Sequence, residues 1–189
     1  MTRILIVPIG RIDSNILNAL RDKLTLIFLN TNCNILREEM PIPSQAYNST
    51  RGQFFSTQIL EVLTAYSKSI EADRILGVAG VDLYVPHLNF VFGEAQCPGR
   101  TAIISLYRLQ PEFYGFSPNA DLFLKRILKE AVHELGHTFG IGHCGRPECV
   151  MFFSNSISDT DRKSSSFCGT CKRTLERNLE ILTKKKWKS

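Results

Sequence analysis

The sequence predicts an α/β (α+β) fold with a larger N-terminal part of strands and helices, a long helix, and a small cysteine-rich C-terminal part. Three observations predict it. Short β-branched apolar runs alternate with segments whose apolar residues recur at helical spacing. A serine and a proline at residues 117 and 118 open a long amphipathic segment. Four cysteines follow residue 143 and lie close together along the chain.

The N-terminal half alternates between the two kinds of element. Strands are predicted at residues 3–9, 24–30, 74–85, 89–94 and 102–108, and helices at residues 15–23 and 51–68. Residues 33–48 carry prolines and polar side chains, which indicates a loop or a short irregular strand. Residues 95–99 predict a hairpin or edge-strand turn.

The C-terminal half begins with the long helix. Ser117 and Pro118 are its predicted N-cap and first residue, and it reaches Phe139 with Lys125, Arg126 and Lys129 facing outward. Residues 154–166 are polar and predict a loop, and residues 168–184 predict an amphipathic helix. Because no linker divides the chain, we expect one domain over residues 1–189, with an N-terminal subdomain at 1–143 and a C-terminal one at 144–189.

The pattern H-E-x-x-H-x-x-G-x-x-H occupies residues 133–143 and contains three of the four histidines of the chain. On a helix His133 and His137 project from one face and can bind one metal ion. Gly140 can end the helix in a left-handed conformation and return His143 to the same ion. Three protein ligands leave one position open, as in a catalytic zinc site. Glu134 is then the candidate general base. The alternative is a helix with two solvated histidines and one in the core.

The four clustered cysteines form a second candidate metal site. Cys144, Cys149, Cys168 and Cys171 make the usual closed ligand set for a structural zinc ion. A redox C-x-x-C pair or two disulfides are the alternatives, but this C-x-x-C follows a polar loop and not a strand of a βαβ unit. The other two cysteines, Cys33 and Cys97, are expected to be buried or semi-buried free thiols.

Residues 131–171 closely resemble the archaemetzincins, a family of metzincin zinc metallopeptidases. The resemblance rests on the long histidine motif, the cysteine directly after it, Cys149, Met151 and the C-x-x-C pair. It implies a single metzincin-like catalytic domain with a twisted mixed sheet, an antiparallel edge strand, an active-site helix and a small zinc-pinned C-terminal subdomain. It also implies two zinc ions, one catalytic on the three histidines and one structural on the four cysteines. Glu134 is then the base, and Met151 a floor under the imidazoles.

Some details of the site depart from the pattern. Phe153 stands where some metzincins carry a tyrosine that approaches the zinc, so the oxyanion must be stabilised by zinc, by backbone or by a residue not yet placed. Tyr107 and Tyr114 are candidates by proximity in sequence, although ordinary half-buried tyrosines are the favoured interpretation. His87 is interpreted as a surface or core histidine. A peptide substrate is expected to add as a strand along residues 102–108.

We therefore expect a zinc-dependent metallopeptidase that acts on short peptides or as an aminopeptidase. The alternative is a non-catalytic zinc-binding protein with a binding or regulatory role, against which Glu134 argues. The net charge of +5 is mild, the lysines of residues 184–188 are typical of a solvated helix end, and no basic stripe with interleaved aromatics predicts nucleic-acid binding. No apolar run is long enough to span a membrane, and the N-terminal residues lack the features of a signal peptide. A cytoplasmic location and, by default, a monomer are expected.

Overall fold

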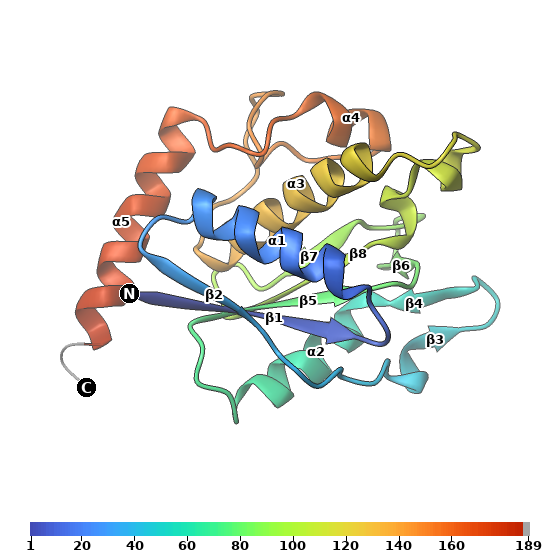
Figure 1. Cartoon of the computed structure of the whole chain (residues 1–189), viewed down its shortest axis with the longest axis horizontal. Helices are drawn as coiled ribbons and strands as arrows, with labels where there is room; N and C mark the ends of the chain where they lie inside the picture. The colour runs from blue at the N-terminus through green and yellow to red at the C-terminus, as the bar shows by residue number, and fades with distance from the viewer. Residues whose placement is uncertain (187–189) are drawn as a thin grey trace.

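The computed structural model describes residues 1–186, with side chains described as far as Lys184. Its centre is a five-stranded sheet in the order β2-β1-β5-β8-β7 (Figure 1). The strands are β1 (Thr2–Ile9), β2 (Thr31–Ile35), β5 (Arg74–Ala79), β7 (Gly93–Ala95) and β8 (Thr101–Ser105). The first four in spatial order run parallel, and β7 pairs antiparallel with β8 at the edge. The mixed sheet with one antiparallel edge strand is thus confirmed.

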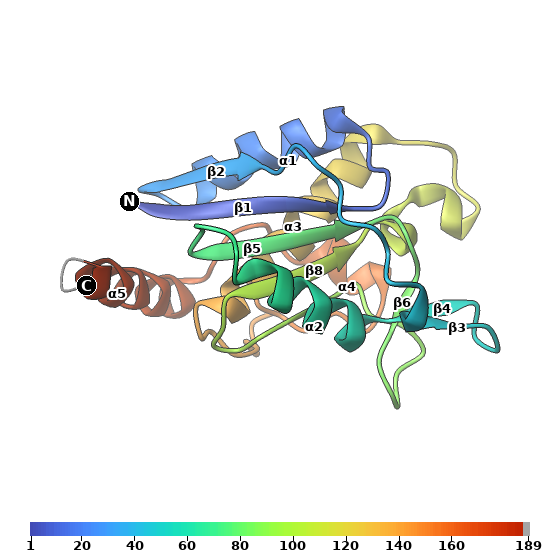
Figure 2. The ribbon, with the colours of Figure 1, turned by 90° about the horizontal axis from the view of Figure 1, so that it is seen from below.

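Helices cover both faces of this sheet. Helices α1 (Ser14–Ile27) and α3 (Ala120–Thr138) lie on one face, and α2 (Ser56–Ser67) lies on the other (Figure 2). Alternate residues of β1 serve the two cores: Ile4 and Ile6 pack toward α1 and α3, whereas Val7 and Ile9 pack toward α2. Burial on both faces explains why the strands read as continuous apolar runs.

The smaller elements lie at the two ends of the sheet. A second sheet of β3 (Tyr47–Asn48), β4 (Gln53–Phe55) and β6 (Leu83–Tyr84) lies beyond the carboxyl ends of the parallel strands, and α5 (Gly169–Lys186) lies near their amino ends (Figures 1 and 2). The remaining elements are η1 (Ser44–Ala46), η2 (Tyr107–Leu109), η3 (Pro111–Tyr114) and α4 (Ile157–Arg162).

The predicted strand at residues 24–30 is wrong, because its first residues belong to the last turn of α1. Leu24 is buried together with Leu17 and Leu20, so the helical spacing continues beyond the predicted end at residue 23. The strand forms at Thr31–Ile35, where Thr31 and Cys33 are the buried alternate residues. The predicted helix at residues 51–68 begins only at Ser56, since Gln53–Phe55 pairs with two other strands.

The predicted start and outer face of the long helix are also corrected. Asn119 is the N-cap, and its side chain accepts a hydrogen bond from the backbone N of Leu122 at 2.9 Å, so Ser117 and Pro118 precede the helix. Arg126 does not face out. Its guanidinium is buried, with a 3% exposed side chain, and makes two 2.7 Å bonds to Asp161, in the segment 154–166 that was predicted as a loop. That segment contains α4.

The predicted substrate-binding edge at residues 102–108 is wrong. Strand β8 lies between β5 and β7, and the chain leaves it at Ser105 for the 3-10 turn η2. The sheet edge next to β8 is β7, the short antiparallel strand, which the apolar run at residues 89–94 only partly indicated. The run at residues 74–85 is likewise divided into β5 and β6.

Two sequence features concern membranes and the C-terminal lysines. In the described part of the chain, no helix combines the length and apolarity that crossing a bilayer requires. The predicted lysine-rich end of the last helix runs into Trp187 and Lys188, which lie outside the described residues.

Candidate metal centres and catalytic site

The three motif histidines come together at the C-terminal end of α3. His133 and His137 lie one turn apart on the helix, and their Nε2 atoms are 3.1 Å apart. The ring of His143 lies 5.4 Å from that of His133 and 4.8 Å from that of His137, measured between centroids. The candidate ligand nitrogens all lie within 4.8 Å of one another. The structure therefore brings together the three residues that the motif predicted.

Backbone carbonyls fix the tautomers of the two helical histidines. His133 Nδ1 lies 2.8 Å from the carbonyl oxygen of Val150, and His137 Nδ1 lies 2.8 Å from that of Ile141. A carbonyl only accepts, so each Nδ1 carries the proton and each Nε2 carries a lone pair. Two lone pairs at 3.1 Å repel unless a cation lies between them, and ligands of a tetrahedral zinc at a Zn–N distance of 2.0–2.1 Å are about 3.3 Å apart. The site therefore fits a zinc ion.

The turn after α3 returns His143 to this point. Gly140 has a φ of 79°, in the left-handed region that glycine adopts at little cost. Its N–H donates to the carbonyl of His137 at 2.8 Å. Asn178 of α5 donates from Nδ2 to the carbonyl of Phe139 at 2.7 Å and so anchors the end of the helix. The predicted role of Gly140 as the end of the helix is confirmed.

Burial keeps the imidazoles in the form that binds metal. It lowers the pKa of His133 well below its usual range, and the charge of Lys163 lowers it further. Burial also lowers the pKa of His137 and of His143, and the charge of Lys163 lowers both further. Neutral histidine is the form that ligates.

Met151 packs directly beneath the helix that carries the motif. A Cβ on Gly136 would lie 2.5 Å from the Met151 sulfur, so the methionine touches the backbone of α3 where the helix has no side chain. Met151 is fully buried. The chain pairs across this turn, because Cys144 donates from its backbone N to the carbonyl of Met151 at 2.9 Å.

Glu134 lies beside the imidazoles on α3 and against the edge strand. It is 5% exposed, and its Cγ and Oε1 would lie 2.6 and 2.7 Å from a Cβ on Gly93 of β7. Burial raises the pKa of the Glu134 carboxyl well above its usual range, the charge of Glu130 reinforces this, and Lys163 opposes it. A carboxylate whose pKa is raised in this way accepts a proton readily.

A cavity of about 180 Å³ opens beside Glu134 and His133. Its lining comes from three parts of the chain: the segment that leads into β7, the helix α3, and the residues after Met151. The lining residues are Leu88, Asn89, Phe90, Val91, Phe92, Gly93, Glu130, His133, Glu134, Phe153, Ser154 and Asn155.

Sequence reasoning missed three residues of this site. Glu130 lines the cavity, and its carboxylate forms a buried ion pair with Lys163 at 3.1 Å. Gly93 makes room for Glu134. Glu130 shares the helix face of the motif, four residues before Glu134, which is a usable signal. Lys163 and Gly93 come from distant segments, and nothing in the sequence marks them.

The oxyanion candidates lie elsewhere. Tyr114 donates from its hydroxyl to the carbonyl of Arg108 at 2.9 Å, and Tyr107 stacks edge-on with Phe113. Neither lines the cavity. Phe153 does line it, and its ring lies 4.8 Å from that of His143. His87 is exposed and takes a positive φ of 70°, directly before Leu88 of the cavity wall, and it does not itself line the cavity.

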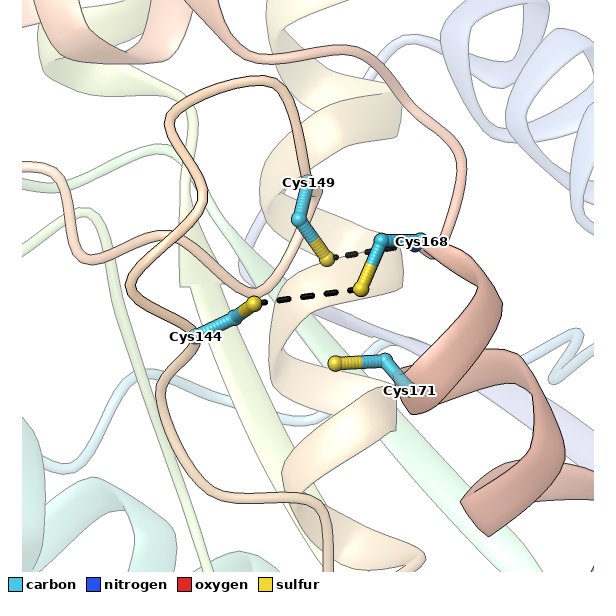
Figure 3. A group of neighbouring side chains, drawn as sticks. All are labelled: Cys144, Cys149, Cys168 and Cys171. Atoms are coloured by element: carbon cyan, nitrogen blue, oxygen red, sulfur yellow. Dashed lines mark hydrogen bonds between the residues drawn. The ribbon is translucent and has the colours of Figure 1, made fainter.

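The four predicted cysteines converge at the start of α5 (Figure 3). Cys144 and Cys149 flank a loop. Cys168 immediately precedes α5, and Cys171 lies in the first turn of that helix. Their sulfurs lie within 4.8 Å of one another, and all four are free thiols. The Cys144–Cys168 sulfur distance is 3.9 Å, against about 3.8 Å for a tetrahedral zinc with Zn–S bonds of 2.3 Å. The donor set fits zinc.

The electrostatics of this cluster favour one thiolate. A hydrogen bond from the backbone N–H of Cys171 lowers the pKa of Cys168 to about 6. Burial raises the pKa of Cys149 and of Cys171. Outside the cluster, Cys33 is buried as expected, and burial raises the pKa of its thiol to about 12. The expectation of a buried or semi-buried thiol is wrong for Cys97, which is exposed in the turn after β7.

Comparison with known proteins agrees with this geometry. A sequence model described as peptidase family M54 matches residues 1–177. The archaemetzincin of Methanocaldococcus jannaschii is 48% identical over 174 residues, covering 92% of this chain and 93% of its own. The crystal structure of archaemetzincin from Methanopyrus kandleri superposes with a TM-score of 0.80 at 39% identity, covering 95% and 96% of the two chains. A zinc-dependent peptidase from Methanocorpusculum labreanum superposes at 0.83 with 29% identity, covering 91% and 99%.

The fold and the matched family define the protein as a zinc-dependent metallopeptidase, a hydrolase of peptide bonds. The chain belongs to the archaemetzincins, peptidase family M54. The predicted family and enzyme class are confirmed, and the non-catalytic alternative is not favoured.

Proposed function

We propose that His133, His137 and His143 hold the catalytic zinc ion. The observation that carries this is the pair of carbonyl-fixed imidazoles, whose Nε2 lone pairs meet at 3.1 Å. When bound there, zinc supplies Lewis-acid chemistry, which acidifies water and polarises a carbonyl group. Three protein ligands would leave one position of the ion for water, and His133 lines the cavity together with Glu134.

Glu134 is the general base in this proposal. Its carboxylate lies in the cavity next to His133, is not among the candidate ligands, and is supported from behind by the edge strand. It takes a proton from the attacking water and delivers it to the nitrogen of the leaving amine. The raised pKa of Glu134 suits both steps, because the group must hold the proton between them.

The peptide backbone lies along β7. This strand pairs with β8 on one side only among the described strands, so its other edge is free to pair with an extended peptide. Gly93 and its neighbours connect that edge to Glu134 and the cavity. The site therefore suits short peptides bound in an extended conformation. The other form of this activity is that of an aminopeptidase, which removes residues from the N-terminus of the peptide.

The four cysteines hold a second, structural zinc ion in this proposal, which gives two ions per chain. Their closed set leaves no position for a substrate, which distinguishes it from the histidine site. The ion ties the loop after His143 to α5 and completes a single catalytic domain. The six free thiols are those of a protein in a reducing compartment, so we place the enzyme in the cytoplasm.

A peptide library tests the activity. Zinc-loaded protein is incubated with peptides that have free or blocked N-termini, and the products are identified by mass spectrometry. We expect cleavage that zinc chelation abolishes and zinc restores. Cleavage only with free N-termini would identify an aminopeptidase. A fully zinc-loaded protein that cleaves nothing would refute the proposal and favour a binding or regulatory role.

A further inference from the structure

The cavity next to Glu134 has the size of one amino-acid side chain. Its volume of about 180 Å³ is below the 300–1,000 Å³ of pockets that hold whole small-molecule ligands. An engineered apolar cavity of about 150 Å³ in an unrelated protein accepts benzene. One aromatic ring with a small substituent therefore fits here.

The walls of the cavity are apolar and partly aromatic. Phe90 and Phe92 contact each other edge to face, with centroids 5.0 Å apart, on the side of β7. Leu88 and Phe153 line the same cavity and are 38% and 39% exposed, so part of the apolar surface of each is free to contact a ligand. Aromatic walls of this kind gain most from burying another ring.

The floor of the cavity is polar. The carboxylate of Glu130 receives a hydrogen bond from Thr160 Oγ1 at 2.9 Å and the Lys163 ammonium at 3.1 Å, and both donors meet Oε1. Among the described contacts this leaves the lone pairs of Oε2 for a ligand. Ser154 in the wall has a buried Oγ that lacks a partner within the described part of the chain. Lys163 balances the charge of Glu130, so the floor is neutral overall.

We propose that this cavity is a specificity pocket for a tyrosine side chain next to the cleaved bond, and that Glu130 is its specificity-determining residue. The ring packs between the aromatic walls, and the phenol hydroxyl donates to Glu130 Oε2. After a χ1 rotation, Ser154 donates to the same hydroxyl, which can both donate and accept. The inference rests on the proposed peptidase function, because it concerns the residue that the peptide presents.

Other side chains fit this floor less well. Phenylalanine fills the walls but leaves Glu130 Oε2 and Ser154 Oγ cut off from water without a partner, which is costly. Lysine and arginine bring a second cation close to Lys163, whose charge already balances Glu130. Neutral aromatic side chains with a hydroxyl meet both requirements.

The test compares peptides that differ only at the residue next to the cleaved bond. For zinc-loaded wild type we expect kcat/KM for tyrosine to exceed that for phenylalanine by about tenfold or more, with O-methyltyrosine, lysine and arginine below tyrosine. In Glu130→Gln the amide oxygen still accepts from Lys163 and Thr160, but the NH2 that replaces Oε2 can only donate, and it donates to a phenol or an ether oxygen alike, so the preference for tyrosine over O-methyltyrosine falls toward unity. Ser154→Ala, which leaves the ion pair intact, lowers the ratio of tyrosine to phenylalanine several-fold.

Two controls separate this inference from the proposed activity. Asp121→Asn makes the same charge change at an exposed position in the first turn of α3 and keeps the wild-type ratio. Binding of the tyrosine and phenylalanine peptides to zinc-loaded Glu134→Ala, measured by calorimetry, shows the preference without turnover. Tyrosine-selective binding without any hydrolysis would refute the activity and keep the pocket. Equal kcat/KM for tyrosine and phenylalanine in an active wild type, or an unchanged ratio in both folded variants, overturns the inference.

Discussion

Glu134 packs against the backbone of Gly93 with no room for a Cβ between them. A Cβ there would lie 2.6 Å from Glu134 Cγ and 2.6 Å from the carbonyl oxygen of Ile103 on β8. The carbonyl belongs to the sheet and cannot move away, so Gly93→Ala must displace either the carboxylate or the edge strand. We expect this variant to bind zinc normally and to lose most of its kcat, by about 100-fold, as misplaced catalytic groups do. Steady-state kinetics with metal analysis measures both.

Gly142→Ala is the matched control for that substitution. Gly142 lies immediately before His143, but a Cβ there meets no atom within 4 Å and its φ is not in the left-handed region. Its kcat should stay within about twofold of wild type, since isolated surface substitutions have small effects. Full activity in Gly93→Ala would show that Glu134 does not depend on its contact with β7.

Glu134→Ala separates metal binding from turnover. The side chain is not among the candidate ligands, so the variant should keep the zinc content of wild type. Loss of a general base lowers kcat by about 10²- to 10⁴-fold. Wild-type turnover in a zinc-loaded Glu134→Ala protein would remove the residue from its proposed role.

The two candidate metal sites can be lost independently. Elemental analysis of wild type should give two zinc ions per chain, one on each cluster. His143→Ala should retain one ion and a wild-type circular dichroism spectrum, because a catalytic ion is not needed to build the fold. Cys168→Ser should also retain one ion but melt at a lower temperature, since a structural zinc contributes directly to folding. A single zinc in wild type would contradict the cysteine site.

The buried ion pair between Glu130 and Lys163 is expected to affect the free energy of unfolding. The side chain of Lys163 is 0% exposed and that of Glu130 is 3% exposed, so Lys163→Met leaves a carboxylate buried without its counter-charge. We expect a loss of about 3–5 kcal/mol in the free energy of unfolding in urea. The double variant Lys163→Met with Glu130→Leu should regain most of it, because neither charge remains. Equal destabilisation in the single and double variants would show that the pair is not coupled.

The sequence predicted the chemistry of the site better than its walls. His133 and His137 could be placed because helix geometry fixes residues one turn apart, and Gly140 because only a left-handed turn returns the chain. Arg126 was misplaced because its partner, Asp161, is 35 residues away. The length of α1 was misjudged for a related reason: the β-branched and aromatic residues after Leu24 are typical of a strand, and only packing against the sheet decides for the helix.

The strand at the edge of the sheet could not be predicted either, again because it depends on contacts between distant parts of the chain. Residues 101–105 and 93–95 both have strand character, and which of them is central depends on the spatial order of β5, β8 and β7. Strand order is a property of the assembled sheet. Lys163 is a second example, because a lysine in a polar segment is expected to be exposed, and only the fold brings its ammonium to Glu130 of α3 and to the carbonyl of Phe152.

The direct succession of His143 and Cys144 has a consequence for biosynthesis. The last histidine of one cluster and the first cysteine of the other are neighbours, but Cys168 and Cys171 leave the ribosome more than twenty residues later. The loop that carries His143 and Cys144 is held by the bond from the Cys144 backbone N to the carbonyl of Met151, and the Cys144 sulfur faces that of Cys168. All three imidazoles are synthesised before the second pair of cysteines, so we expect the histidine cluster to be available to a metal ion before the cysteine cluster is complete.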